Sequence, residues 1–212
     1  MDQWGIDQPK WASLTSEDAA FNFADAVGYP VLVRPSYVLS GAAMNVAYTP
    51  GELNKIVSKA EAVSSEYPIV ISEFVEGARE IDVDAVANKG QVIAHSIAEH
   101  VENAGVHSGD ATLVLPTQTI SEADLAKCKD TIAKVAEALE ISGPFNMQLL
   151  AKDGTIKIIE TNLRASRSCP FSSKAIGTDL IEKAPRVIVG ADTPADDELY
   201  GPLVEPRLTL EA

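Results

Sequence analysis

Residues 159–167 read IETNLRASR, and this stretch indicates both the fold and the chemistry of the chain. Glu160 and Asn162 are two residues apart, so on a strand both side chains point to one face. Carboxylate and amide oxygens are ligands for hard cations such as Mg²⁺, which usually keep nucleotide phosphates as further partners. Arg164 and Arg167 follow at once, and their planar guanidinium groups suit phosphate oxygens. The stretch predicts a phosphoryl-transfer site, and the alternative for an isolated motif is a solvated, charged loop.

A hairpin turn just before this stretch sets which side chains meet. Residues 152–154 read KDG, and a three-residue loop with glycine last fits a type I turn plus bulge. That register pairs Asn146 with Glu160 and Gln148 with Ile158, and it puts Gln148 on the same face as the acid and amide above. A two-residue Asp-Gly loop would shift the register by one residue and put Gln148 behind the sheet. The predicted site therefore favours the three-residue loop.

Composition limits the classes of partner. The chain has 212 residues with 17 basic and 31 acidic side chains, a net charge of −14, which argues against a nucleic acid or an anionic membrane as the main partner. No apolar run approaches membrane-spanning length. The two cysteines have neither disulfide nor metal-ligand spacing, which suits a reducing compartment. The abrupt start of the sequence suggests a piece cut from a longer protein.

Strands and helices alternate along the chain without a strict βαβ repeat. This order favours two mixed α/β units over a doubly wound sheet. Capping residues, apolar periodicity and turn residues predict helices at 15–28, 50–65, 121–139 and 180–189, strands at 29–37 and 68–75, and hairpins at 79–98 and 145–161.

Two loops are candidates for ligand contact. Arg34 precedes the small residues Ser40 and Gly41, and backbone amides in such a loop can hold phosphate oxygens. His107 lies between two glycines after a hairpin strand, where backbone can approach a ligand closely. An ordinary connection and an exposed turn are the alternatives for these loops taken singly. The P-loop pattern and the dinucleotide-binding glycine pattern are both absent from the sequence.

Four stretches carry a family resemblance: VRPSYVLSGAAM at 33–44, EIDVDA at 80–85, EHVENAGVHSGD at 99–110, and residues 160–174. Together they closely resemble the large subunit of carbamoyl phosphate synthetase, an ATP-grasp enzyme, over about residues 5–190. RPSYVL, AGVHSGD and RASRSCPF resemble the second half of that subunit, which phosphorylates carbamate. The first half, which activates bicarbonate, typically carries a Ser-Ala-Tyr version of the loop. Many relatives have Gly-Gly-Arg where residues 40–42 read SGA, a form that is similar to the eukaryotic enzyme.

The resemblance implies a role for each matching residue. Gln148, Glu160 and Asn162 would hold Mg²⁺ or Mn²⁺, and Arg164 and Arg167 would hold the phosphoryl group or carbamate, with Asn162 counted among the catalytic residues. The remaining implied ATP ligands are Arg34, Ser40 and Gly41 at the phosphates, Glu73 and Glu80 at the ribose, Ile71, Ser72 and Val75 at the adenine, partly through backbone groups, and Val106, His107 and Ser108 beside the ribose and phosphates. Apart from the resemblance, Asp82 and Asp84 are expected on one polar strand face, and the alternative is that these carboxylates flank the nucleotide pocket.

The resemblance also implies the fold and the reaction. The expected fold is a mixed α/β (α+β) ATP-grasp domain at residues 1–190, with two subdomains that grip ATP, a nucleotide-lid subdomain at about 30–110, and a linker or tail at 191–212. The implied reaction converts Mg-ATP and carbamate into ADP and carbamoyl phosphate, in pyrimidine or arginine biosynthesis. The implied partners are the bicarbonate-activating half, a glutaminase and a regulatory domain of the same synthetase. The expected location is the cytoplasm, with the mitochondrial matrix as the alternative.

Two other hypotheses stay open at this point. One is another ATP-grasp ligase, such as a biotin-dependent carboxylase, although RPSY at 34–37 and GVHSGD at 105–110 speak against it. The other is a fragment that binds nucleotide, or packs against partner domains, but is inactive in isolation.

Overall fold

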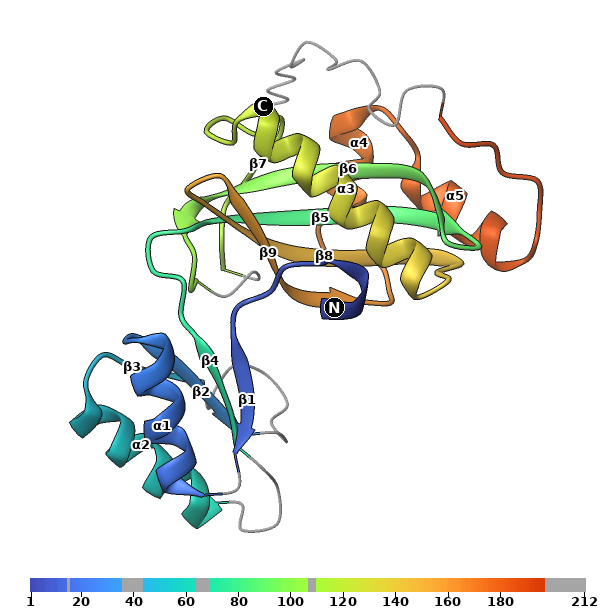
Figure 1. The fold of residues 1–212 in the computed structure, drawn as a ribbon. Coiled ribbons are helices and arrows are strands. Elements are labelled where there is room, and N and C mark those ends of the chain that lie inside the picture. Colours follow the sequence, from blue (N-terminus) through green and yellow to red (C-terminus); the bar gives the residue numbers. More distant parts are fainter. Residues whose placement is uncertain (15, 36–43, 64–68, 107–109, 197–212) are drawn as a thin grey trace. The chain divides into compact units, whose positions relative to one another are not determined.

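The chain forms two compact units in the computed structural model, which describes residues 1–14, 16–35, 44–63, 69–106 and 110–196. The smaller unit is Pro9–Glu76, and the larger unit combines Met1–Gln8 with the chain from Gly77 onward (Figure 1). The expected lid subdomain at about 30–110 overlaps the smaller unit only in part, and the functional division of the domain stays a prediction.

The smaller unit is an antiparallel four-stranded sheet covered by two helices on one face. The strand order is β1-β4-β2-β3, with β1 at Trp11–Leu14, β2 at Val31–Pro35, β3 at Asn45–Ala47 and β4 at Ile69–Glu73. Helix α1 spans Glu17–Val27 and α2 spans Pro50–Val63. Alternate strand residues face the helices and build the core, which includes Leu14, Ala20, Ala24, Val31, Val33, Leu53, Val57 and Ile71.

The larger unit is built on a five-stranded antiparallel sheet with the order β7-β6-β5-β8-β9. Its strands are β5 at Arg79–Asn88, β6 at Gln91–Asn103, β7 at Leu113–Val114, β8 at Gly143–Lys152 and β9 at Thr155–Asn162. Its helices are η1 at Asp2–Trp4, α3 at Glu122–Ala138, α4 at Cys169–Ile176 and α5 at Leu180–Ile188. Within the described residues no helix is both long and apolar enough to cross a membrane.

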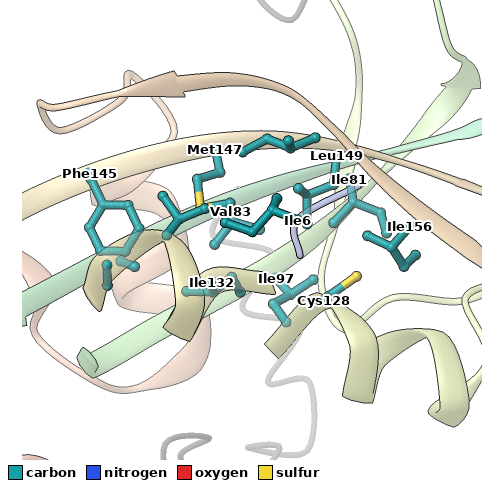
Figure 2. Close-up of a cluster of buried hydrophobic side chains, with 14 of the residues drawn as sticks. Ile6, Ile81, Val83, Ile97, Cys128, Ile132, Phe145, Met147, Leu149 and Ile156 are labelled. Carbon is teal, nitrogen blue, oxygen red and sulfur yellow. The ribbon is translucent and has the colours of Figure 1, made fainter. Parts of the chain in front are cut away.

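The two faces of the larger sheet differ in character. Helix α3 packs on one face, where Ile132 meets Val83 and Met147 in a continuous apolar cluster (Figure 2). Helices α4 and α5 pack on the other face, against Val86 and Ala94 at one end of the strands. The rest of that second face carries polar side chains, which are described below.

The hairpin of β8 and β9 has a register different from the predicted one. Lys152 pairs directly with Thr155, so the loop has two residues, both with positive φ, a conformation that tight hairpin turns require. The predicted three-residue loop, with its pairs Asn146–Glu160 and Gln148–Ile158, is therefore wrong. The physical reason is that Asp153 and Gly154 alone form the tight turn. A β-bulge further along the hairpin, which a pattern of turn residues does not reveal, compensates for the shorter loop.

The bulge restores the expected face. Leu149 pairs with Ile158, and the next pair is Gln148 with Glu160, so Ile159 is an extra residue in β9. One extra residue reverses the orientation of everything beyond it. Gln148 consequently lies beside Glu160, as the sequence interpretation required, by a different route.

Most predicted elements are confirmed within two residues at their ends, and β6 continues five residues beyond its predicted end at Ala98. Helix α1 begins after Ser16, which accepts a hydrogen bond from Ala19 N, and α3 begins after Ser121, which accepts from Asp124 N. The short strands β1, β3 and β7 and helix α4 were not predicted. The predicted helix and strand ends at 36–37 and 64–65 lie outside the described residues.

Candidate functional site

A polar face occupies the part of the larger sheet beyond the apolar contacts of α4 and α5. It comprises Glu80, Asp82 and Asp84 of β5, Asn146 and Gln148 of β8, and Glu160 and Asn162 of β9. The ladder pairs these residues across strands: Asp84 with Asn146, Asp82 with Gln148, Gln148 with Glu160, and Asn146 with Asn162. The sheet thus assembles four acids and three amides on three adjacent strands, because side chains two apart on a strand share a face.

The structure brings the three predicted metal ligands together at one edge of this face. Gln148 is half-buried and bonds to the Asp82 carboxylate, while Glu160 is exposed and Asn162 is half-buried. Within the described ranges, no group of three His, Cys, Asp or Glu side chains could hold a metal ion. The predicted trio has one acid and two amides, a donor set that fits an oxygen-liganded cation needing phosphate oxygens to complete it.

Two acids of the polar face have strongly perturbed proton affinities. Burial raises the pKa of Glu80 to about 7, the Asp82 and Glu160 charges add to this, and a backbone hydrogen bond from Gly105 opposes it. Burial also raises the pKa of Asp82 to about 6. Crowded carboxylates with raised pKa values favour a cationic ligand, since a nearby cation stabilises their charged forms.

His100 lies beside Glu80 but does not form an ion pair with it at neutral pH. Its Nδ1 is 4.0 Å from the Glu80 Oε2, and its side chain is fully buried. Burial lowers the pKa of His100, and the Glu102 charge only partly opposes this. His100 is therefore neutral at pH 7, which matches a structural role.

The two predicted anion ligands follow β9 directly. Arg164 and Arg167 are both exposed, and Arg164 Nη1 donates to the backbone oxygen of Ala165 at 3.2 Å. Ser166, between the two arginines, donates to the carboxylate of Asp84. The arginine segment is therefore tied to the centre of the sheet while its guanidinium groups stay accessible.

The other predicted ligands fall into two groups. Arg34, Ile71, Ser72, Glu73 and Val75 belong to the smaller unit. Arg34 is exposed, Ile71 is fully buried in the core of that unit, and Glu73 accepts a hydrogen bond from Lys10 N at 3.3 Å.

Four predicted ligands lie outside the described residues: Ser40, Gly41, His107 and Ser108. Val106 is described and is exposed after the end of β6. The nucleotide contacts of both groups stay predictions.

Sequence reasoning placed Asp82 and Asp84 on a polar strand face, which is confirmed, but it gave neither a partner. Asn146 was missed. Its Nδ2 donates to Asp82 Oδ1 at 2.7 Å and lies 3.4 Å from Asp84 Oδ1. The sequence signal for this cluster is the acid at every second position, 80, 82 and 84, because it places three carboxylates on one face of the strand.

The sequence model of the family described as "Carbamoyl-phosphate synthase L chain, ATP binding domain" matches residues 5–195. The chain belongs to this family.

Two relatives illustrate the membership. The chain is 56% identical over 190 residues to "Multifunctional protein ura1" of Schizosaccharomyces pombe, covering 90% of this chain and 8% of that protein. It is 52% identical over 206 residues to "Carbamoyl phosphate synthase arginine-specific large chain, mitochondrial" of the same organism, covering 94% of this chain and 18% of that protein. The chain therefore spans less than a fifth of the length of either of these two relatives.

Solved structures confirm the predicted mixed α+β, ATP-grasp-like fold. The biotin carboxylase domain of the Hydrogenobacter thermophilus 2-oxoglutarate carboxylase, in complex with MgADP, ADP and bicarbonate, matches with a TM-score of 0.79. The match covers 94% of this chain and 46% of that chain at 19% identity. A match at this identity shows the fold alone.

Proposed function

We propose that this carbamoyl-phosphate synthase domain binds Mg-ATP and phosphorylates carbamate, giving carbamoyl phosphate and ADP. The observation that carries the proposal is the pairing of Gln148 with Glu160 across β8 and β9, with the arginine segment following at once. The predicted cation ligands and anion ligands would thereby occupy adjacent positions at the end of one hairpin. Family membership supports ATP as the nucleotide.

In the proposed reaction the protein mainly positions the reactants and neutralises the charge of the phosphoryl oxygens. Phosphoryl transfer depends on holding the reactants in line and on neutralising the equatorial phosphoryl oxygens. Arg164 and Arg167 would bind these oxygens and the carbamate. Gln148, Glu160 and Asn162 would hold Mg²⁺, which when bound neutralises charge on the nucleotide phosphates.

The bonding changes follow from the substrates. A carbamate oxygen forms a bond to the γ-phosphorus, and the bond from that phosphorus to the bridging oxygen breaks. ADP leaves with the electron pair. No side chain has to form a covalent intermediate, so no catalytic nucleophile is required.

The assignment to the carbamate-phosphorylating half is supported by sequence motifs. RPSYVL at 34–39, AGVHSGD at 104–110 and RASRSCPF at 164–171 resemble that half. We also propose that the domain works with the bicarbonate-activating, glutaminase and regulatory parts of a longer synthetase. The relatives are several times longer than this chain, which supports such partners. We also propose a cytoplasmic or mitochondrial location for the protein.

A second candidate function is a nucleotide-binding domain that is inactive without the rest of the synthetase. The observation that favours it is coverage, because the chain matches only 8% and 18% of the two relatives described above. Both candidates require MgADP binding, and only the first requires turnover by this chain.

One experiment separates the candidates. The chain is mixed with MgADP and carbamoyl phosphate, ATP formation is measured, and MgADP binding is measured by calorimetry in parallel. We expect ATP formation by the wild type and none by Glu160→Gln, with Glu137→Gln on the exposed surface of α3 as the matched control. MgADP binding without ATP formation would favour the second candidate. Failure of the wild type to bind MgADP would contradict both.

A further inference from the structure

Asp84 is a buried carboxylate to which the proposed chemistry assigns no part. It lies in the middle of β5 with 2% of its surface exposed. Burying a carboxylate is costly unless donors satisfy it. Its Oδ1 accepts from Ser166 Oγ and lies 3.4 Å from Asn146 Nδ2, and its Oδ2 accepts from Ser168 Oγ at 3.0 Å and Ser172 Oγ at 3.1 Å. Three hydroxyl groups thus converge on one carboxylate.

Two of these hydroxyls flank Arg167 in the sequence. Ser166 precedes the arginine and Ser168 follows it, so Asp84 binds the chain on both sides of Arg167. The two serine hydroxyls are 2.7 Å apart, and Ser166 Oγ also accepts from Cys169 N at 3.0 Å. The short connection between β9 and α4 is therefore fixed by a residue more than 80 positions earlier in the chain.

The same network reaches the predicted cation ligands. Asn146, beside Asp84, donates to Asp82 Oδ1 at 2.7 Å, and Asp82 bonds to the Gln148 side chain. Asp84 consequently lies between the strand that carries Gln148 and the segment that carries Arg167. One buried acid is connected both to the predicted cation site and to the predicted anion site.

We propose that Asp84 is a positioning residue that, through Ser166 and Ser168, fixes the backbone of Arg167 so that its guanidinium meets the transferring phosphoryl group in one place. The inference rests on the proposed function, which makes Arg167 a phosphoryl ligand. A guanidinium on an already ordered segment loses less conformational entropy when it binds an anion, so pre-ordering strengthens binding. An Asp84 that only stabilised the fold would change the free energy of unfolding and leave anion affinity alone.

The test measures anion affinity on the full chain. Calorimetry gives the dissociation constant of inorganic phosphate with the protein saturated with MgADP, and separately that of MgADP. Loss of an ordered charge-assisted contact predicts phosphate binding about 10-fold weaker in the double variant Ser166→Ala/Ser168→Ala. MgADP affinity should stay within about twofold.

A serine of helix α4, which follows the connection that carries Ser166 and Ser168, supplies the matched control. Ser173 is buried in α4, donates to Thr178 O at 2.8 Å and accepts from Leu180 N at 2.9 Å, and it makes no bond to Asp84 among the described contacts. Ser173→Ala removes buried hydrogen bonds of the same kind, so it should leave both affinities within about twofold of wild type.

A double-mutant cycle tests whether Asp84 acts through the arginine. Arg167→Ala should weaken phosphate binding about as much as the serine variant, and adding Asp84→Asn to it should cause less than about a twofold further loss. Additive losses would overturn the inference. If Asp84→Asn does not fold, the phosphate affinity of Ser166→Ala/Ser168→Ala alone tests the inference.

The outcomes separate the inference from the proposed function. Unchanged phosphate affinity in the serine double variant, with Arg167→Ala impaired, overturns the role of Asp84 and leaves the proposed function standing. Unchanged affinity in Arg167→Ala, or no phosphate binding by the MgADP-saturated wild type, also overturns the inference. A wild type that does not bind MgADP contradicts the proposed function itself.

Discussion

Glu99 on the α3 face of the five-stranded sheet and the pair Glu80 and Asp82 on the polar face are buried carboxylates with opposite pKa shifts. Glu99 pairs with Ile81, whose side chain packs in the cluster under α3, and Glu99 is fully buried. It accepts from Arg79 Nη2 at 2.8 Å, Gln118 N at 2.7 Å and Thr119 N at 2.9 Å. Burial raises its pKa, but these hydrogen bonds and that from the Thr119 hydroxyl outweigh burial and hold the pKa at about 2.

Two acids of the polar face, Glu80 and Asp82, show the reverse shift. Glu80 and Asp82 have pKa values raised to about 7 and about 6, because burial and neighbouring acids outweigh the few donors they have. A carboxylate with a complete set of protein donors stabilises the fold. A buried carboxylate that lacks a complete set of protein donors destabilises the fold, and its oxygens remain able to bind a ligand. This difference in donors separates Glu99, a structural acid, from Glu80 and Asp82, which are candidate functional acids.

The largest predicted effect comes from placing an acid on the apolar face. Met147 is fully buried and adjacent in sequence to Gln148, whose side chain points to the polar face. Met147→Asp should lower the free energy of unfolding by more than about 4 kcal/mol, or prevent folding, since the new carboxylate has no donor. The measurement is urea-induced unfolding.

Its matched control is the neighbouring position. Gln148→Ala removes a half-buried side chain from the polar face, and it should cost less than about 1.5 kcal/mol. An equal decrease in the free energy of unfolding for Met147→Asp and Gln148→Ala would show that the two faces do not differ as described.

The second effect concerns Glu99. Glu99→Gln removes the charge that Arg79 and the two backbone amides bind, so it should lower the free energy of unfolding by about 3 kcal/mol at pH 7. Because the folded pKa lies below the ordinary value of 4.5, the stability from Glu99 is present above pH 4.5 and is lost as the pH falls toward 2. The measurement is the free energy of unfolding between pH 7 and pH 2, and a wild type and variant with the same acid dependence would contradict the assignment.

The third and smallest predicted effect is a gain in stability, and it concerns Glu80. Glu80 has a folded pKa raised above its ordinary value of 4.5 to about 7, so wild-type stability falls as the pH rises through this window. Glu80→Gln should remove that loss and raise the free energy of unfolding at pH 8 by about 1–2 kcal/mol. Thermal unfolding at pH 5 and pH 8 measures it, and a variant less stable than wild type at pH 8 would contradict the raised pKa.

Local signals in the sequence were enough for most elements of the fold. Caps such as Ser16 and Ser121 and the turn residues at 89–90 and 153–154 act over a few positions, and the helices and hairpins next to them were predicted. The strands β1 and β3 are only 4 and 3 residues long, too short for an alternating pattern to develop. Helix α4 follows Arg167 and has Pro170 in its first turn, so the segment looked like a loop.

The candidate site was predictable only in part. The spacing of Glu160, Asn162 and the two arginines is local, and it gave the order of the predicted cation and anion ligands along the chain. The hydrogen bonds of Asp84 join residues more than 80 positions apart, and such pairings depend on the tertiary fold. The bulge at Ile159 is equally hidden, because it follows from the competition between the turn and both faces of the sheet.

The bulge at Ile159 has a consequence for length variation in this hairpin. Removing Ile159 leaves Gln148 opposite Glu160 and Leu149 opposite Ile158, since the remaining residues already pair in regular order. A one-residue deletion elsewhere in β9 can be absorbed in the same way, at the cost of the local twist that a bulge adds. A residue inserted into β9 cannot be absorbed in this way. It would need a second bulge, or it would turn Glu160 toward the apolar core. Among homologous chains, β9 should therefore tolerate shortening by one residue better than lengthening.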